Sequence, residues 1–350
     1  MRIVHIIKGD LYGGSDTLSR LLFSQIGEEY EQLLLLLERE GIDPYKKFNA
    51  ENLYRIKLKN EILFVNLYCK ISKLIKADII HLHHIKLWIF LFPLIVFKEK
   101  LISSFHINFG SGIKKGYLQN LLIFLIINYT TLFSKRLIFL TKGQKEHLKK
   151  YSIFKNSFEK KSRIIPNFIS KEKIIEKKKR YNKNIIFVGR YTKIKGFEDL
   201  TEVARLVPEL NFNLIGNNEY LPNIKNMYNI GEIDNSKMHK EYDKNSILIL
   251  PSYTEAFPMV ILEAMARGLV ILVSDLPGMR EIVKEGHNGY LFPPGDIQKM
   301  KKIILYLKNN PKEIERISKN NLKDIWKFTQ EKQIPKYFKL YKEVLKDVKK

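Results

Sequence analysis

Short apolar runs, each followed by a longer stretch with helical spacing, restrict the fold of this chain more than any other feature. In the first half the runs cover Arg2–Ile7, Gln32–Leu37, Ile79–His83, Leu101–Phe105 and Arg136–Leu140. In the second half they cover Asn184–Val188, Phe212–Ile215, Ile247–Leu250 and Val270–Val273. Runs of this kind are typical of parallel strands that helices cover on both faces. The alternation predicts βαβ units in both halves, and therefore an α/β fold.

The length and one turn predict two domains. The chain has 350 residues, and single hydrophobic cores seldom grow beyond roughly 250–300 residues. Pro166-Asn167 forms a turn signal, and a strongly charged stretch follows it. We therefore expect one doubly wound α/β domain before this turn and a second one after it, facing each other.

Neither cysteine content nor apolar segments indicate export or a membrane span. The single cysteine, Cys69, excludes an internal disulfide and favours a reducing, cytosolic compartment. The first residues lack a cleavage-site pattern. Leu87–Phe97 is uncharged but too short, because a spanning helix needs about 20 residues. Gly116–Ser134 is interrupted by polar residues and is predicted to be a buried or interfacial helix that leads into a strand.

The positive charge is concentrated in one segment. The formal net charge is +24, and residues 134–195 hold twenty Lys or Arg against four Asp or Glu. Such a band attracts an anionic membrane surface, nucleic acid or phosphate-bearing ligands, and a solvated lysine-rich face explains it equally well. The sequence carries no nucleic-acid-binding motif, so we expect no specific nucleic-acid partner.

Two loops at predicted strand ends have the composition of phosphate or sugar sites. Ligands of doubly wound sheets bind at the carboxyl ends of the strands. Gly13 and Gly14 precede a helix and allow close approach of the backbone, although a tight turn explains them as well. Arg190 and Lys195 follow the strand Asn184–Val188, where the two cations are able to hold a diphosphate. The dinucleotide fingerprint G-x-G-x-x-G is absent.

Five motifs in order resemble the family 4 retaining glycosyltransferases of the GT-B fold, of the bacterial surface-polysaccharide type. They are Gly13-Gly14, Ser104-Phe105-His106, Ile165-Pro166-Asn167, the loop with Arg190 and Lys195, and the E-x7-E pair Glu255 and Glu263. The resemblance implies two facing Rossmann-like domains with an interdomain cleft. Residues 1–167, with a C-terminal helix 334–350 that crosses back, would bind the acceptor, and residues 168–333 the nucleotide-sugar.

The resemblance also implies roles for the two glutamates. Glu255 would contact the hydroxyls of the donor sugar, and Glu263 those of the ribose. If the segment is helical throughout, eight residues span about 12 Å, too far for a glycosidase pair. A pairing role without ligand is the rival interpretation for Glu263. Further donor contacts are expected from a group of residues around them: Gly13, Gly14, Ile233, Ala256, Phe257, Pro258, Met259 and Val260.

Backbone N–H groups between the glutamates are expected to meet the diphosphate. The amides of Phe257–Val260 would open a helix, where anions bind. Pro258 stands where the family often has glycine, and it removes one N–H from this cradle. The base is expected near Asn229–Ile233.

The expected catalytic residues are Glu255, His106, Arg190 and Lys195. The family often has a histidine near the donor sugar at the position of His106, and a satisfied core histidine is the alternative. We expect no metal at His81, His83 and His84, because only the first two share a strand face and no carboxylate matches them. With no Asp-x-Asp in the sequence, we predict a metal-independent enzyme without a cofactor.

The resemblance implies retaining transfer of a hexose or N-acetylhexosamine from a nucleotide-sugar to a glycan or lipid-linked acceptor. We expect the nucleotide-sugar to be a UDP-sugar. The products would be cell-surface polysaccharide, lipopolysaccharide or glycolipid. The enzyme would be cytoplasmic and peripheral on the inner face of the membrane. The alternatives are a sugar phosphorylase or epimerase on the same scaffold, or a non-catalytic membrane-associated binder of nucleotides or glycans.

Overall fold

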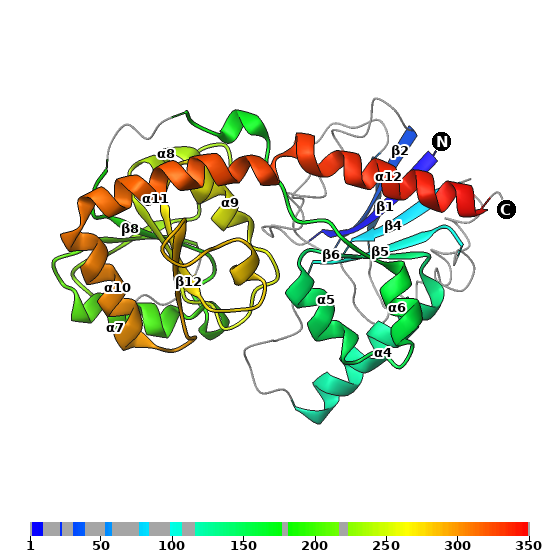
Figure 1. Ribbon diagram of the computed structural model, residues 1–350, viewed down its shortest axis with the longest axis horizontal. Helices are drawn as coiled ribbons and strands as arrows, with labels where there is room; N and C mark the ends of the chain where they lie inside the picture. The colour runs from blue at the N-terminus through cyan, green and yellow to red at the C-terminus, as the bar shows by residue number, and fades with distance from the viewer. Residues whose placement is uncertain are drawn as a thin grey trace. The chain divides into compact units, whose positions relative to one another are not determined.

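A computed structural model of the protein describes residues 2–9, 22, 31–38, 53–57, 77–83, 99–106, 116–176, 181–216 and 223–348. The chain forms two compact units. The first is assembled from three segments, Met1–Ile107, Lys115–Pro166 and Gln333–Lys350, and the second is built mainly on 167–332. Each unit contains one sheet of parallel strands (Figure 1).

The sheet of the first unit has the order β3-β2-β1-β4-β5-β6-β7. Its strands are β1 (Arg2–Gly9), β2 (Glu31–Glu38), β3 (Leu53–Lys57), β4 (Ile79–His83), β5 (Leu101–Phe105), β6 (Arg136–Phe139) and β7 (Ser162–Ile164). The strand order reverses direction between β1 and β4. In doubly wound sheets such a reversal opens a crevice at the carboxyl ends of the two strands.

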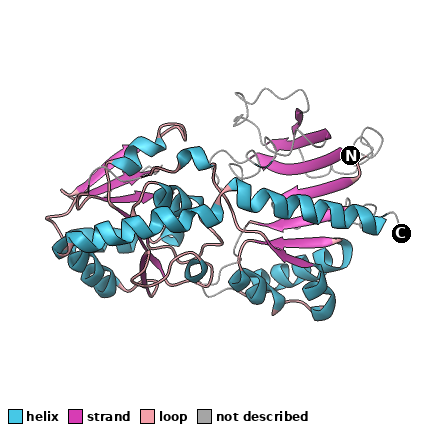
Figure 2. Ribbon diagram, turned by 45° about the horizontal axis from the view of Figure 1, so that its top comes forward, coloured by secondary structure: helices cyan, strands magenta, loops and turns pink. Residues whose placement is uncertain are grey.

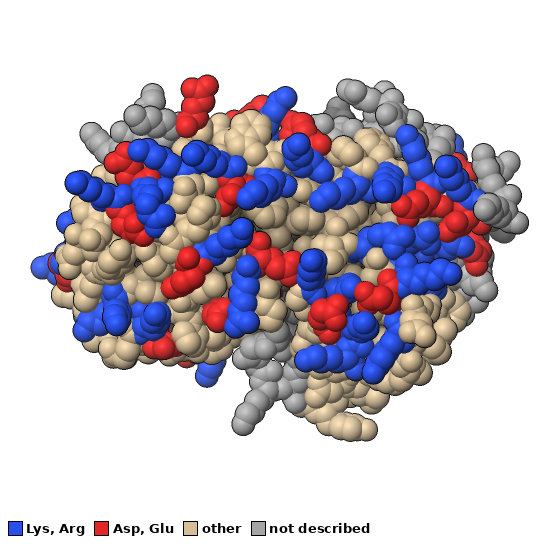
Figure 3. Space-filling model, viewed as in Figure 1, with Lys and Arg blue, Asp and Glu red and all other residues tan. Residues whose placement is uncertain are grey.

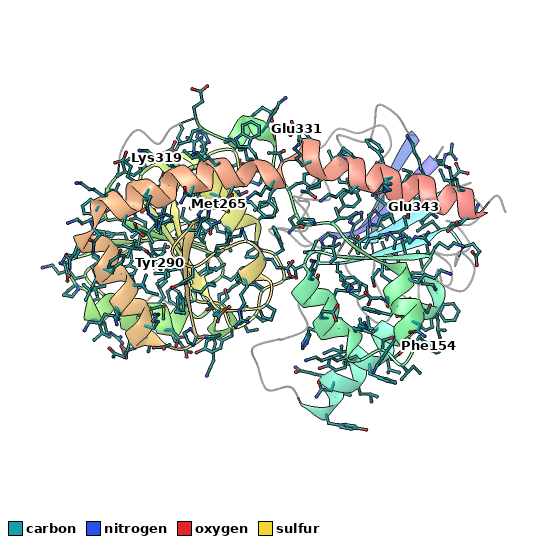
Figure 4. The ribbon with its side chains drawn as sticks, in the orientation of Figure 1. Phe154, Met265, Tyr290, Lys319, Glu331 and Glu343 are labelled. Atoms are coloured by element: carbon teal, nitrogen blue, oxygen red, sulfur yellow. The ribbon has the colours of Figure 1, made fainter. Side chains whose placement is uncertain are left out.

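Helices cover both faces of this sheet (Figures 1 and 2). They are α4 (Tyr117–Phe133), α5 (Lys142–Lys149), α6 (Lys155–Lys161) and α12 (Gln330–Val348), which enters this unit at Gln333. Phe139 of β6 packs on Phe158 of α6, with ring centroids 5.2 Å apart. On the other face Glu343 of α12 (Figure 4) forms an ion pair with Arg163, at 3.1 Å.

The sheet of the second unit has the order β10-β9-β8-β11-β12-β13, with a reversal between β8 and β11. Its strands are β8 (Ile185–Val188), β9 (Phe212–Ile215), β10 (Met227–Gly231), β11 (Ile247–Leu250), β12 (Val270–Ser274) and β13 (Gly289–Phe292). Every residue of β11 and β12 is buried. This burial on both faces explains why the two strands read as unbroken apolar runs.

The helices of the second unit supply the outer layers. They are η3 (Lys171–Lys173), η4 (Lys193–Lys195), α7 (Phe197–Leu206), α8 (Met238–Asp243), α9 (Met259–Ala266), η5 (Met279–Glu281), α10 (Ile297–Asn309), α11 (Pro311–Asp324) and η6 (Ile325–Phe328). Met265 of α9 (Figure 4) is completely buried, like most of this short helix. The core of the unit therefore anchors α9 close to the edge where β11 ends.

The α/β class with two parallel sheets is confirmed, and each of the nine predicted strands is present with ends within two residues. Four strands, β3, β7, β10 and β13, were not predicted. The stretch 116–134 forms helix α4 and leads into β6, as predicted. Among the described residues, none of the helices combines the length and the apolar character that a membrane span requires.

Candidate active site

Two loops of the second unit emerge from neighbouring strands at the reversal of strand order. β8 is followed by the loop 189–196, and β11 by the loop 251–258. The strands are parallel and paired, since Ile247 lies opposite Ile185. Their carboxyl ends therefore meet at one edge of the sheet, which is where doubly wound sheets bind ligands.

An ion pair joins the two loops. The Lys195 Nζ lies 2.5 Å from the Glu255 Oε1, and the side chains are 24% and 10% exposed. The Ser252 hydroxyl donates to the same carboxylate oxygen at 3.0 Å. The structure thus brings together two of the four predicted catalytic residues. A lysine and a carboxylate side by side suit a ligand with both anionic phosphates and sugar hydroxyls.

Backbone contacts hold these loops against each other. The Tyr253 N–H donates to the Ile194 carbonyl at 2.9 Å. Gly196 has a φ of +68°, and a Cβ there would lie 1.9 Å from the Pro251 carbonyl oxygen. Gly278, in the loop after β12, approaches the Ala256 carbonyl so closely that a Cβ would lie 2.4 Å from it. Neither glycine can carry a side chain without displacing a loop, so the backbone positions at the site are fixed by packing.

The helix that follows Glu255 starts at the site. Helix α9 begins at Met259, and Pro258 precedes it in an extended conformation. The first N–H groups of a helix have no intrahelical acceptor and attract anions. The Asn167 side-chain amide donates to the Phe257 carbonyl at 2.7 Å and is buried. Asn167 therefore fixes the orientation of the peptide just before the helix.

Glu263 lies nearer the start of the helix than expected. It is the fifth residue of α9, just over one turn inside, whereas a segment helical from Glu255 onward would place it about two turns in. The condition for the 12 Å span, a segment that is helical throughout, is not met, because the first residues after Glu255 precede the helix. The Tyr242 hydroxyl donates to the Glu263 Oε2 at 3.0 Å, and the Lys173 Nζ lies 3.5 Å from the Oε1. Glu263 thus has protein partners on both carboxylate oxygens.

The hydroxyl that holds Glu263 is itself deeply buried. Tyr242 is 1% exposed, and burial, followed by the charge of Glu263, raises its pKa well above the usual value. A hydroxyl with a raised pKa stays protonated and remains a donor. Tyr242 and Lys173 were not predicted, because their proximity to Glu263 depends on how α8 and η3 pack around α9.

Two further predicted donor residues of this unit, Arg190 and Ile233, lie in the loops after β8 and β10. Arg190 is exposed, and it forms no ion pair with any residue that the structure describes. Ile233 is half-buried in the loop after β10. Close to it, the Asn229 side-chain oxygen accepts from the Tyr191 hydroxyl at 2.9 Å and from the Gly231 N–H at 3.0 Å.

In the first unit, His106 follows β5 and ends a row of histidines. The His83 Nδ1 lies 3.3 Å from the His106 Nε2, and the His83 Nε2 lies 3.1 Å from the His5 Nδ1. His81 instead contacts the Tyr341 hydroxyl at 2.8 Å and the Ser104 hydroxyl at 2.7 Å. Burial, with smaller contributions from His5 and His106, holds the pKa of His81 well below its usual value.

Three histidines of the first unit, His5, His81 and His83, lie close enough together to hold a metal ion, which was not expected from the sequence. His81 and His83 share one strand face, as predicted, with ring centroids 3.9 Å apart. Their ligand nitrogens and that of His5 lie within 4.8 Å of one another, and no carboxylate joins them in the part of the chain that the structure describes. His5 was missed, although the parallel register pairs it with His81. The predictions for His84, Gly13 and Gly14 fall outside the described residues.

Residues 169–324 match the model of the family described as glycosyl transferases group 1. The match, which covers less than half of the chain, shows that this segment is similar to that family, and we call residues 169–324 the group 1 region. The group 1 region contains both loops of the site, with Arg190, Lys195, Glu255 and Glu263, whereas His106 lies outside it.

Relatives of the group 1 region come from bacteria, an archaeon and a plant. The chain is 35% identical over 143 residues to an uncharacterized glycosyltransferase of Haemophilus influenzae. The aligned residues cover 37% of this chain and 40% of that protein. It is 25% identical over 268 residues to the N,N'-diacetylbacillosaminyl-diphospho-undecaprenol alpha-1,3-N-acetylgalactosaminyltransferase of Campylobacter jejuni, covering 71% and 70% of the two chains. The chain spans about half the length of the curated relatives that it matches first.

Solved structures show the same fold over nearly the whole chain. The structure of Anabaena Alr3699/HepE in complex with UDP and glucose has a TM-score of 0.80 at 15% identity, and the match covers 98% of this chain and 100% of that one. At this identity the likeness establishes the fold, which is that of the GT-B glycosyltransferases.

Proposed function

We propose that this chain is a retaining, metal-independent glycosyltransferase that moves a hexose or N-acetylhexosamine from a UDP-sugar to a glycan or lipid-linked acceptor. The observation that carries the proposal is the Lys195–Glu255 ion pair, which lies where the strand order of the group 1 region reverses. A nucleotide-sugar offers phosphates and hydroxyls along one extended molecule. The site offers a cation, a helix start and two separate carboxylates to match them.

In this proposal the bond between the anomeric carbon and the diphosphate breaks while the acceptor hydroxyl bonds to the same face of the sugar. The diphosphate leaves with the bonding electrons, and its growing negative charge is met by Lys195, Arg190 and the first amides of α9. A donor phosphate oxygen takes the acceptor proton. Glu255 holds the hydroxyls of the sugar, and Glu263 those of the ribose.

The roles of the first unit rest on the resemblance of its motifs. We propose that His106 contacts the donor sugar and that Gly13 and Gly14 approach the ligands with their backbone. The choice of UDP as the nucleotide of the donor is supported by the Anabaena structure with bound UDP and glucose. A lipid-linked acceptor is supported by the Campylobacter relative, whose name specifies a diphospho-undecaprenol. The names of the Haemophilus and Campylobacter relatives specify glycosyl transfer, which disfavours the phosphorylase, epimerase and non-catalytic alternatives.

The proposal is tested by thermal unfolding with UDP, GDP, ADP and CMP. A ligand that binds only the folded protein raises the melting temperature by mass action. We expect UDP to raise it and Glu263→Ala to reduce that rise. The matched control is Glu315→Ala on α11, which also removes a glutamate paired with a lysine, at 2.8 Å, but outside the site. The absence of a shift with every nucleotide would count against the proposal.

We also propose that the first unit rests on an anionic membrane surface. Helix α4 carries no charged residue, and its outer face exposes apolar side chains such as Tyr117 (85%) and Leu118 (66%). Figure 3 shows uncharged surface at the lower end of this unit, where α4 lies in Figure 1, with Lys and Arg beside it. Exposed apolar area next to basic charge is the usual pair of signals for reversible attachment.

A further inference from the structure

Three imidazole rings of the first unit form one continuous row of nitrogen contacts. It runs from the His5 Nδ1 to the His83 Nε2 over 3.1 Å, and from the His83 Nδ1 to the His106 Nε2 over 3.3 Å. The rings are also stacked in sequence, with centroids 5.3 Å and 5.5 Å apart. Both nitrogens of the central ring are thereby committed to histidine partners.

The row comes from three strands at the point where the first sheet reverses its order. His5 lies on β1, His83 ends β4, and His106 directly follows β5. His5 and His83 are 0% and 2% exposed. Buried groups of this kind are seldom charged, because transfer of a charge from water into a protein interior is costly. The lowered pKa of the adjacent His81 has the same cause.

A neutral imidazole carries one N–H and one acceptor nitrogen, so the row has only two consistent arrangements. In the first, the Nδ1–H of His5 donates to His83, the Nδ1–H of His83 donates to His106, and His106 is protonated on Nδ1. In the second, every proton sits on Nε2 and each donation runs the other way. A change at one ring therefore requires a change at all three.

We propose that His5 and His83 are positioning residues that tie the tautomer of His106 to their own, so that all three rings adopt the same one. This inference rests on the proposed function for the role of His106 toward the sugar. The His106 Nε2 faces His83, and its Nδ1 lies outside the row. The row therefore decides whether Nδ1 acts as a hydrogen-bond donor or as an acceptor, and with it which sugar hydroxyl geometry His106 accommodates.

The primary test needs no substitution. Ring-nitrogen NMR of the full chain labelled with 15N-histidine distinguishes a protonated from an unprotonated nitrogen in each imidazole. We expect His5, His83 and His106 to show one shared tautomer, each with one nitrogen of each kind. Signals that place these rings in different tautomers, or a doubly protonated His83, would overturn the inference.

A pair of variants tests the coupling. His83→Phe keeps a ring of similar size and removes both links, so the two His106 nitrogens should move toward averaged shifts as both tautomers become populated. His81→Phe is the matched control, since His81 is equally buried but bonds to Tyr341 and Ser104. If His83→Phe does not fold, His5→Phe removes the far link and should have the same effect. A His106 signal unchanged in these variants would contradict the coupling.

A second readout separates this inference from the proposed function. UDP release from UDP-glucose and UDP-N-acetylglucosamine should slow by about tenfold in His83→Phe, the effect of one lost hydrogen bond, with unchanged affinity for UDP. If neither sugar nucleotide binds the wild type, the proposed function fails, while the shared tautomer is still decided by NMR. If both bind and turn over equally in the wild type and His83→Phe, the positioning role fails alone.

Discussion

Lys195 holds the Glu255 carboxylate and, in the proposed reaction, faces the leaving diphosphate. We expect Lys195→Ala to reduce donor turnover by roughly 100-fold, the usual effect of removing one charge that stabilises a transition state. The free energy of unfolding should fall by only about 1 kcal/mol, because the ion pair is partly exposed to water. UDP release kinetics and urea denaturation measure the two effects.

The control for this variant is Lys193→Ala, which removes an exposed lysine of the same 3-10 turn. Lys193 forms no ion pair with a described residue, and its removal should leave turnover within about twofold, since surface charges contribute little. Equal losses in the two variants would show that the loop responds to total charge rather than to the Lys195–Glu255 contact.

Tyr242 supports Glu263 through a buried hydroxyl. Tyr242→Phe removes the donor and keeps the ring, so the free energy of unfolding should fall by about 1 kcal/mol. The rise in melting temperature with UDP should also shrink, because Glu263 is no longer held in one orientation. Tyr290→Phe is a matched control, since its hydroxyl donates to Glu313 at 2.7 Å, outside the site (Figure 4). A full UDP response in Tyr242→Phe would contradict this role.

The residues of the site divide into those that a sequence reveals and those that only packing reveals. Lys195 and Glu255 could be predicted, because residues just after an apolar run lie at the carboxyl edge of a parallel sheet. Tyr242 could not, because its hydroxyl meets Glu263 only through the packing of α8 on α9. His5 lies between the two cases, since the register of β1 with β4 identifies it once the strand order is known.

At the scale of elements, the strands that sequence reasoning missed share one property. β3 and β7 are the two edges of the first sheet, and β10 and β13 are the edges of the second. An edge strand is paired on one side only, and it does not need a continuous apolar run. In β10 the central three residues are exposed. Apolar runs therefore predict the interior strands of both sheets but not the edge strands.

Gly196 couples two of these elements, because it lets the turn after β8 press against the end of β11. Gly196→Ala should lower the free energy of unfolding by roughly 2–4 kcal/mol, since a left-handed φ and a steric clash both act against it. Gly286→Ala is the matched control, with a φ of +69° and no atom within 4 Å of the added Cβ. It should cost only about 1 kcal/mol.

Urea denaturation of both variants separates the two contributions. The difference between them reports the contact with the Pro251 carbonyl, and the UDP response should be weakened in Gly196→Ala alone. Similar stabilities for the two variants would mean that the loops yield easily, and that their packing does not fix the site.

At the scale of the whole molecule, membrane attachment should require both apolar area and positive charge. We expect the protein to sediment with phosphatidylglycerol-containing liposomes at low salt and less at high salt, because salt screens the attraction. Leu118→Ser/Leu125→Ser on the exposed face of α4 should weaken sedimentation at both salt concentrations.

Two exposed apolar residues of the second unit provide the control for this measurement. Leu206 and Tyr306 are 40% and 46% exposed, and Leu206→Ser/Tyr306→Ser should sediment like the wild type. If both double variants reduce sedimentation equally, the binding is non-specific hydrophobic adsorption rather than attachment through α4. A protein that stays in solution with these liposomes at every salt concentration would contradict the proposed attachment.

The division of the first unit into three chain segments has a consequence for biosynthesis. His81 on β4 bonds to Tyr341 on α12 across 260 residues of sequence. During translation the second unit, largely one continuous segment, is able to complete its sheet while the first still lacks its last helix. The part of the protein that leaves the ribosome first is thus the part that matures last. Until Gln333–Lys350 has been synthesised, the polar histidine face of its sheet lacks this cover.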